Sequence, residues 1–181
     1  MVYLFLADGF EVIEAMSPLD MLRRAKIETV TVGVTGKNVT ASCGVTVTAD
    51  ITIDEFTFNN ADAIILPGGM PGTLNLEENS VVQSAIDKAD AEGKLICAIC
   101  AAPSVLGHKG LLNGKEATCY PGFEDALEGA SLSEKYVAVD GNIITARGAG
   151  VSVEFGLEIV KQLKGEAESQ RVRKSIQCNE K

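Results

Sequence analysis

Histidine is nearly absent from this chain, and long apolar runs are missing. The one histidine, His108, argues against a structural zinc site and against a metal site built on two histidines. It stands near the end of a short predicted helix, facing the negative end of the helix dipole, so we expect a structural role for it. Five cysteines are an odd number in a chain large enough to fold without disulfides, so we expect reduced thiols.

No segment predicts a membrane span or a secretion signal. The longest apolar stretch, Leu95 to Gly107, is interrupted by Pro103 and is shorter than the roughly 20 residues that a bilayer requires. The N-terminus has no basic region and reaches Asp8 too early for a signal peptide. The chain carries 25 acidic against 16 basic residues, which disfavours nucleic acid and anionic membranes as partners. These features predict a cytoplasmic protein.

The chain shows no repeat, linker or low-complexity segment, and 181 residues fit one domain. We therefore expect a single domain over residues 1–181, with the charged end at 166–181 forming a surface helix or a tail. The predicted strands are Val2–Ala7, Ile27–Val34, Ala63–Leu66 and Leu95–Ile99, and the predicted helices are Glu11–Arg24, Val81–Glu92, Ala101–Leu106 and Gly150–Leu163. This alternation indicates an α/β fold with a mostly parallel sheet and helices on both faces.

Two predicted hairpins and two helix details add to this outline. Val39–Ala49 is rich in valine and threonine and predicts a hairpin or an extended excursion of the chain. The tripeptide Asp140-Gly141-Asn142 stands between two short apolar segments and predicts a second hairpin. Pro18 predicts a kink or a restart of the first helix, with Ser17 as a cap. Ser80 is the expected cap of the helix that follows it.

Three predicted strands end in residues suited to chemistry. Glu11 and Glu14 follow the first strand, Pro67-Gly68-Gly69 follows the strand at 63–66, and Cys100 follows the strand at 95–99. Ligand sites in parallel sheets lie beyond the carboxyl ends of the strands. We therefore expect function where these strand ends meet.

Cys100 is the strongest candidate nucleophile. It stands where an apolar strand passes into a helix through two small residues, the arrangement of a nucleophile elbow. The helix N-terminus would favour the thiolate and lower the pKa of the thiol. The alternative is a buried cysteine that packs as a small hydrophobe, and the local pattern leaves both open. Cys97 and Cys100 also form a C-x-x-C motif, which is typical of thioredoxin-like redox sites. Cys97 lies inside the strand, however, and residues three apart in a strand point to opposite faces, so we expect Cys97 in the core.

The remaining cysteines carry little information. Cys43 stands in the predicted hairpin, either near a dimer contact or simply in the turn. Cys178 lies in the polar end of the chain, where we expect it to be exposed. Nothing in the sequence indicates a role for Cys119.

The glutamates and glycines at the strand ends each allow two interpretations. Acidic residues in a first helical turn often only complement the helix dipole. If Glu14 instead faces the strand ends, burial raises its pKa and lets it exchange a proton with a thiol. The segment Pro67-Gly68-Gly69 is either a plain turn or a loop whose N–H groups face a ligand as an oxyanion site.

The segment Gly148-Ala149-Gly150-Val151 nearly matches a dinucleotide-binding fingerprint. Val153 replaces the third glycine of that motif, and no later strand remains to bring an acidic residue to a ribose. We therefore expect no nicotinamide or flavin cofactor.

With these residues located, the sequence resembles the ThiJ/PfpI superfamily, and within it the Parkinson-disease deglycase branch and its bacterial relatives. The resemblance covers roughly Val2 to Leu163 and rests on five segments in the family's order. These are Gly9-Phe10-Glu11-Val12-Ile13-Glu14, Asp20-Met21-Leu22-Arg23-Arg24-Ala25, Ile65-Leu66-Pro67-Gly68-Gly69, Ala98-Ile99-Cys100-Ala101-Ala102-Pro103, and Arg147-Gly148-Ala149-Gly150 with Glu154-Phe155-Gly156.

The resemblance implies a flavodoxin-like three-layer α/β sandwich, usually a homodimer. Cys100 matches the family's nucleophile and redox-sensitive cysteine, and Glu14 matches the protonated glutamate that hydrogen-bonds it. Gly69 and Ala101 match the backbone donors beside the cysteine. Members of this branch are described as glutathione-independent glyoxalases, as deglycases, and as oxidative-stress sensors or chaperones.

Two departures from the family pattern limit the expected chemistry. Family members called proteases carry histidine directly after the cysteine, and Ala101 takes that place here, which argues against peptidase activity. In the human branch a histidine precedes a proline after the next strand, whereas here Tyr120 precedes Pro121. A tyrosine hydroxyl donates a hydrogen bond but is no base near neutral pH. We keep Gly68 and Tyr120 as candidate pocket residues.

The expected function is that of a cofactor-independent enzyme acting on small 2-oxoaldehydes, such as methylglyoxal, or on their adducts. Cys100 and Glu14 would be catalytic, with the N–H groups of Gly69 and Ala101 as oxyanion donors and no metal. The alternative is a non-catalytic redox sensor or chaperone that uses an oxidisable Cys100. A third alternative is a scaffold without either activity, which predicts an ordinary pKa for the Cys100 thiol.

Overall fold

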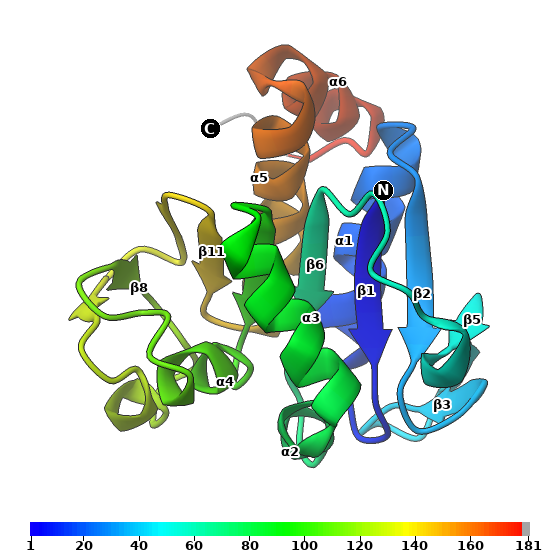
Figure 1. The fold of residues 1–181 in the computed structure, drawn as a ribbon. Coiled ribbons are helices and arrows are strands. Elements are labelled where there is room, and N and C mark those ends of the chain that lie inside the picture. Colours follow the sequence, from blue (N-terminus) through cyan, green and yellow to red (C-terminus); the bar gives the residue numbers. More distant parts are fainter. Residues whose placement is uncertain (179–181) are drawn as a thin grey trace.

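A computed structural model describes residues 1–178 and shows a central seven-stranded sheet (Figure 1). The strand order is β10-β11-β7-β6-β1-β2-β5. The strands are β1 (Val2–Leu6), β2 (Thr29–Gly33), β5 (Ile51–Thr52), β6 (Ala63–Leu66), β7 (Leu95–Ile99), β10 (Val137–Asp140) and β11 (Ile143–Ala146). Every neighbouring pair is parallel except β10 and β11, which form an antiparallel hairpin. The mostly parallel sheet and the second predicted hairpin are thereby confirmed.

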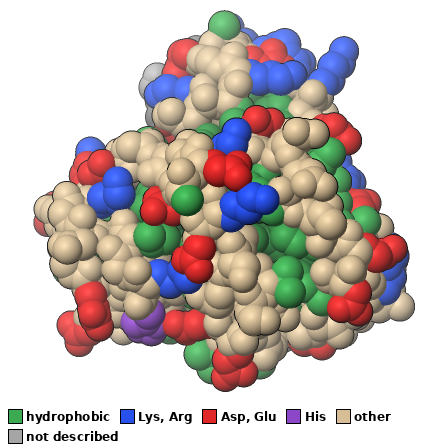
Figure 2. All heavy atoms as spheres, in the orientation of Figure 1, with side chains coloured by type: hydrophobic (Ala, Val, Ile, Leu, Met, Phe, Trp, Pro, Cys, Tyr) green, Lys and Arg blue, Asp and Glu red, His purple; other side chains and the backbone are tan. Residues whose placement is uncertain are grey.

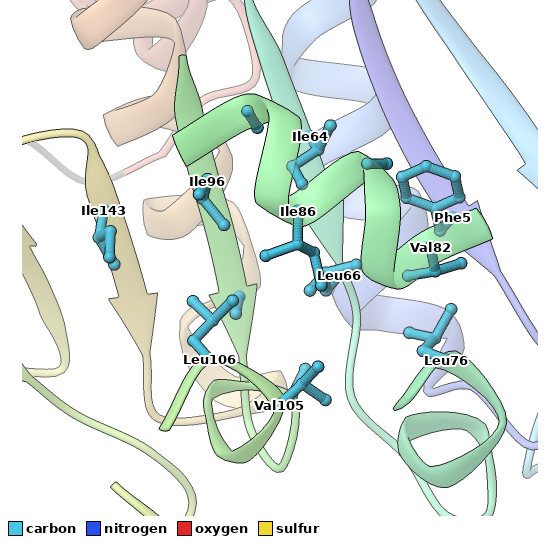
Figure 3. Close-up of a cluster of buried hydrophobic side chains, with 14 of the residues drawn as sticks. Phe5, Ile64, Leu66, Leu76, Val82, Ile86, Ile96, Val105, Leu106 and Ile143 are labelled. Atoms are coloured by element: carbon cyan, nitrogen blue, oxygen red, sulfur yellow. The ribbon is translucent and has the colours of Figure 1, made fainter. Parts of the chain in front are cut away.

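Helices cover both faces of the sheet, as predicted. One face carries α2 (Gly72–Glu78), α3 (Ser80–Ala91) and α4 (Pro103–His108), and the other carries α1 (Val12–Arg24), α5 (Ser152–Lys164) and α6 (Glu166–Ser175). Figure 3 shows the first of the two apolar cores, in which Phe5, Ile64 and Leu66 of the sheet face Val82 and Ile86 of α3.

The inner strands are buried on both sides, which explains their continuous apolar sequence. In β7, Ile96 and Ala98 belong to the core under α3, whereas Cys97 and Ile99 belong to the core under α1 and α5. Cys97 is completely buried, so its predicted core position is confirmed.

The first helix does not restart at Pro18. Helix α1 runs unbroken from Val12 to Arg24, and the predicted cap at Ser17 is wrong. Pro18 packs against α5 at a glycine, since a Cβ added to Gly156 would lie 2.7 Å from Pro18 Cα. This close packing stabilises the helix and offsets the backbone hydrogen bond that proline cannot donate.

Helix α3 is capped by Asn79 and not by Ser80. The Asn79 side chain accepts hydrogen bonds from the N–H groups of Val81 and Val82 at 3.0 and 3.1 Å. Ser80 is already the first helical residue. Both residue types are good caps, and the actual helix start decides between them.

The charged end of the chain forms a docked helix. In α6, Val172 is fully buried and Arg173 is only 5% exposed, because the Arg173 guanidinium pairs with Glu154 of α5. Cys178 is partly buried, with its sulfur 3.5 Å from Arg173 Nη1, so the expectation of an exposed Cys178 is wrong. Residues 179–181 of the predicted tail lie outside the described residues.

Smaller elements lie outside the seven-stranded sheet. The predicted hairpin at 39–49 is confirmed as the antiparallel pair β3 (Asn38–Thr40) and β4 (Thr46–Thr48), with the exposed Cys43 in its turn. The parallel pair β8 (Glu116–Ala117) and β9 (Ser131–Leu132), the helix α2 and the 3-10 turns η1 (Ile53–Glu55), η2 (Glu124–Ala126) and η3 (Ala149–Val151) were not predicted.

The surface shows charged side chains of both signs on the face drawn in Figure 2, and the single histidine lies at its edge. His108 pairs there with Glu77, which joins α4 to α2. Within residues 1–178, no helix is long and apolar enough to cross a membrane.

Candidate active site

The site lies where the strand order reverses. From β1 the chain adds β2 and β5 on one side, then returns to place β6 and β7 on the other. The carboxyl ends of β1, β6 and β7 are therefore adjacent, and the crevice at such a switch point is where α/β sheets bind ligands. Glu14 follows β1, Gly68 and Gly69 follow β6, and Cys100 follows β7. The structure brings these residues together, as the sequence predicted.

Cys100 occupies a strained turn directly after β7. Its φ of 65° lies in the left-handed region, which is unfavourable for a residue with a side chain. Two backbone hydrogen bonds of 2.8 Å hold the turn, one from Cys100 N–H to the carbonyl of Ala146 and one from Tyr120 N–H to the carbonyl of Cys100. This conformation is the nucleophile elbow expected from the sequence.

The sulfur of Cys100 is surrounded by hydrogen-bonding groups. The backbone N–H groups of Gly69 and Ala101 donate to it, and the carboxyl group of Glu14 is hydrogen-bonded to it. Gly68 brings the pair together, because a Cβ at that position would lie 2.6 Å from Cys100 Cβ and 2.7 Å from Glu14 Oε2. Only glycine fits between them.

Glu14 is buried in this arrangement. Its side chain is 1% exposed, its Oε2 accepts a hydrogen bond from Gly68 N–H at 2.9 Å, and the backbone of Ala149 supplies another. Burial raises the pKa of Glu14 to about 7, although these hydrogen bonds partly oppose it. Of the two interpretations of Glu14, the structure favours the one in which it faces the strand ends. The N-cap of α1 is Glu11, whose carboxylate accepts a hydrogen bond from Ile13 N–H at 3.5 Å.

The thiol of Cys100 does not have the lowered pKa that its position predicted. Burial, and then the negative charge of Glu14, raise its pKa to about 12, against smaller opposing effects of the Ala101 and Gly69 N–H groups. The helix dipole lowers the pKa of Cys100 only slightly, because α4 has six residues and begins only at Pro103. A resting thiol therefore needs a proton acceptor, and Glu14 is in contact with it.

A pocket of about 300 Å³ adjoins the pair. It is lined by Tyr120, Pro121, Tyr136 and the segment 147–151. Gly148 joins it to the pair, since a Cβ there would lie 3.2 Å from the Tyr120 ring and 3.7 Å from Glu14 Oε1. Tyr120, expected as a pocket residue, is thus in the wall, whereas Gly68 is not.

Sequence reasoning missed Tyr136 and the role of the segment 147–151. By its local pattern alone, that segment indicates only an incomplete dinucleotide motif. Its glycines instead bring the chain close to Glu14 and the Tyr120 ring. The signal that pointed to it was Arg147-Gly148-Ala149-Gly150, one of the five segments of the resemblance.

Other reactive residues lie apart from the pair. His108 pairs with Glu77 at the surface. Cys119 is buried, and burial raises the pKa of its thiol to about 11. Across residues 1–178, no three His, Cys, Asp or Glu side chains are placed to hold a metal ion.

Known proteins are similar to this chain in sequence and in fold. Residues 1–162 match the DJ-1/PfpI family. Protein DJ-1 homolog B of Arabidopsis thaliana is 38% identical over 92% of this chain, which spans only 39% of that relative's length. Protein dj-1beta of Drosophila melanogaster is 36% identical over 94% of this chain and 93% of its own. A protein named as a deglycase in Pyrococcus abyssi is 32% identical over 90% of this chain and 99% of its own.

Solved structures of the same group superpose closely. The crystal structure of Drosophila melanogaster DJ-1beta has a TM-score of 0.94 at 35% identity, covering 99% of this chain and 98% of that one. The structure of Toxoplasma gondii DJ-1 in oxidized form has a TM-score of 0.95 at 34% identity, with the same coverage. The flavodoxin-like sandwich implied by the resemblance is thereby confirmed, and the chain belongs to the DJ-1/PfpI family.

Proposed function

We propose that the chain is a cysteine-dependent enzyme that converts 2-oxoaldehydes, or their adducts, to 2-hydroxy acids without an organic cofactor or a metal. The observation that carries the proposal is the contact between the buried Glu14 carboxyl and the Cys100 sulfur, with the N–H groups of Gly69 and Ala101 on the same sulfur. The arrangement combines a nucleophile, a group that titrates near neutral pH, and preorganised donors.

In the first step, Cys100 Sγ attacks the aldehyde carbon. The carboxylate of Glu14 accepts the thiol proton and passes it to the aldehyde oxygen, which gives a hemithioacetal. The N–H groups of Gly69 and Ala101 stabilise the oxyanion that develops before the proton arrives. The pKa of Glu14 near 7 suits both the acceptance and the return of this proton.

In the second step, Glu14 removes the proton from the former aldehyde carbon and returns it to the neighbouring carbon. The hydroxyl proton of the hemithioacetal moves to the oxygen of that neighbouring carbon through the enediol. The hemithioacetal becomes a thioester of the 2-hydroxy acid. Water then cleaves the carbon–sulfur bond, which releases the acid and restores the Cys100 thiol. One aldehyde and one water give one 2-hydroxy acid, and no electron acceptor is needed.

Two further observations support this class of reaction. One relative, which this chain covers over 99% of its length, is named a deglycase. Ala101 follows Cys100 at the position where family members called proteases carry a histidine, so the cysteine–histidine dyad of a peptidase mechanism is missing.

The test measures loss of methylglyoxal and formation of lactate without glutathione, in a buffer free of amines. Wild type should form lactate, and Cys100→Ser and Glu14→Gln should lose it by at least about a hundredfold. Cys43→Ser, which changes an exposed cysteine in the hairpin turn, is the matched control and should keep full turnover. Aldehyde loss without lactate in wild type would refute the enzyme and indicate simple trapping by thiols.

A redox sensor or chaperone is the second candidate function. The N–H groups at the sulfur would also hydrogen-bond the oxygens of a sulfinate, and one solved relative is described as oxidized. Two molecules of peroxide would convert the Cys100 thiolate to a sulfinate and release two waters. Mass spectrometry after peroxide treatment tests this function: two oxygens gained on Cys100, together with no lactate formation, favour the sensor.

The quaternary state and compartment belong to the same proposal. We propose that the chain acts in the cytoplasm as a homodimer, the state that the resemblance to the family implies. Light scattering on the purified chain tests the homodimer, for which we expect twice the mass of one chain.

A further inference from the structure

Two large aromatic side chains stand exposed beside the reactive pair. Tyr120 is 51% and Tyr136 is 64% exposed. Both line the pocket of about 300 Å³, whose accessible wall is almost wholly apolar. An exposed apolar wall that costs free energy in water generally marks a place where a ligand binds.

The wall is joined directly to the catalytic pair. Tyr120 N–H donates to the carbonyl of Cys100, and the Tyr120 ring lies against Gly148, which in turn approaches Glu14 Oε1. A substrate whose aldehyde carbon meets Cys100 would therefore extend past Gly148 and Tyr120 into this pocket.

The rings are positioned before any ligand binds. The Arg147 guanidinium carbon lies 5.4 Å from the centre of the Tyr136 ring, and Arg147 N–H donates to the Tyr136 carbonyl at 3.0 Å. Within residues 1–178 the Arg147 side chain makes no ion pair, and its buried Nε has no hydrogen-bond partner. The contact between the guanidinium and the ring restrains Tyr136, and a restrained ring loses less conformational entropy when a ligand binds.

The volume and polarity of the pocket indicate the ligand class. Its volume lies at the lower end of the range of about 300–1,000 Å³ for small-molecule sites. Methylglyoxal would place only a methyl group there. An anionic substituent would find almost no polar atom in the wall, whereas a flat apolar group could lie against both tyrosine rings.

We propose that the Tyr120–Tyr136 pocket selects 2-oxoaldehydes that carry a large apolar substituent, preferably aromatic, over methylglyoxal. This inference rests on the proposed function, since it names the substrate class of the same site. Tyr120 and Tyr136 are then specificity-determining residues that contact the substituent, and Arg147 positions the ring of Tyr136.

The test compares phenylglyoxal with methylglyoxal as substrates, by their kcat/KM ratio. Tyr120→Ala and Tyr136→Ala should each lower the ratio of phenylglyoxal to methylglyoxal by about tenfold, mainly through a higher KM for phenylglyoxal. Tyr120→Phe and Tyr136→Phe keep the aromatic rings and should have the wild-type ratio. Val81→Ala, which truncates an exposed apolar residue on α3, is the control and should leave the ratio unchanged. A ratio unaffected by both alanine variants would overturn the inference.

A binding measurement separates this inference from the proposed function. The neutral ketone 2-hydroxyacetophenone has the phenyl group but no aldehyde, and hydroxyacetone is its methyl counterpart. Saturation-transfer NMR with Cys100→Ser should show binding of the phenyl compound only, and loss of it in Cys100→Ser with Tyr136→Ala. If no aldehyde is turned over, tyrosine-dependent binding still supports the pocket, and absence of binding overturns it.

Discussion

The carboxyl group of Glu14 and the sulfur of Cys100 form one hydrogen-bonded pair, although they come from different helix–strand units. Burial disfavours a negative charge on either residue, and a charge on one raises the pKa of the other. The two groups therefore titrate as a unit. Their proximity depends on Gly68, whose hydrogen atom occupies the space between them.

The first prediction concerns the pH dependence of activity. Below pH 7 both groups hold their protons and no acceptor exists for the thiol proton, so kcat/KM should rise with pH and level off above about 7. The measurement is a pH profile of lactate formation from methylglyoxal. Glu14→Gln should remove this inflection from any residual activity, and a wild-type profile that is flat between about pH 5 and 8 would contradict the assignment.

The second prediction concerns stability. The pKa of Glu14 is raised in the folded state from 4.5 to about 7, so its contribution to stability is fully present below pH 4.5 and is lost as pH rises through 7. Relative to Glu14→Gln, wild type should lose on the order of 2–3 kcal/mol of unfolding free energy between about pH 5 and 8.5.

Urea unfolding of both proteins at the two pH values measures this difference. Glu11→Gln, on the partly exposed neighbour at the start of α1, is the matched control. An equal pH dependence in wild type and Glu14→Gln would show that Glu14 is not held in a buried site.

The third prediction concerns Gly68→Ala. The added methyl group would meet Cys100 Cβ and Glu14 Oε2, so the pair must separate. We expect a loss of about 1–3 kcal/mol of stability and at least a tenfold loss of lactate formation. Gly93→Asn is the control, because its φ of 62° suits asparagine and no atom lies within 4 Å of the added Cβ. Full activity in Gly68→Ala would disprove the packing argument.

The fourth prediction compares two arginines of α6. Arg173 is 5% exposed and pairs with Glu154, whereas Arg171 pairs with Glu168 at the surface. Arg173→Ala should cost about 3 kcal/mol, because it leaves a carboxylate without its buried partner, and Arg171→Ala should cost less than about 1 kcal/mol. Chemical denaturation distinguishes the two, and equal effects would argue against a docked α6.

The fifth prediction concerns the start of α3. Asn79→Ala should cost about 1 kcal/mol, because the N–H groups of Val81 and Val82 lose their acceptor. Ser80→Ala should have little effect. If thermal melts showed a larger loss of stability for Ser80→Ala than for Asn79→Ala, Ser80 would be the cap.

The sequence predicts strands and site positions correctly where the local pattern of apolar residues is strong. The predicted bounds 63–66 and 95–99 coincide with β6 and β7, because a strand buried on both faces is a continuous apolar run. Helix α2 was missed, since its seven residues are too few to show helical periodicity. The pair β8–β9 was missed because two-residue strands have no pattern of their own.

Local sequence determined that Cys100 ends a buried strand and that Glu14 follows another, and those positions place both at one edge of a parallel sheet. Only the tertiary structure decided their protonation. Both pKa values are raised by burial among segments that lie far apart in the chain, and the hydrogen bonds from Gly68 and Ala149 oppose this effect only in part at Glu14. The helix dipole, the one effect that the local sequence could indicate, is weaker than that desolvation because α4 is short.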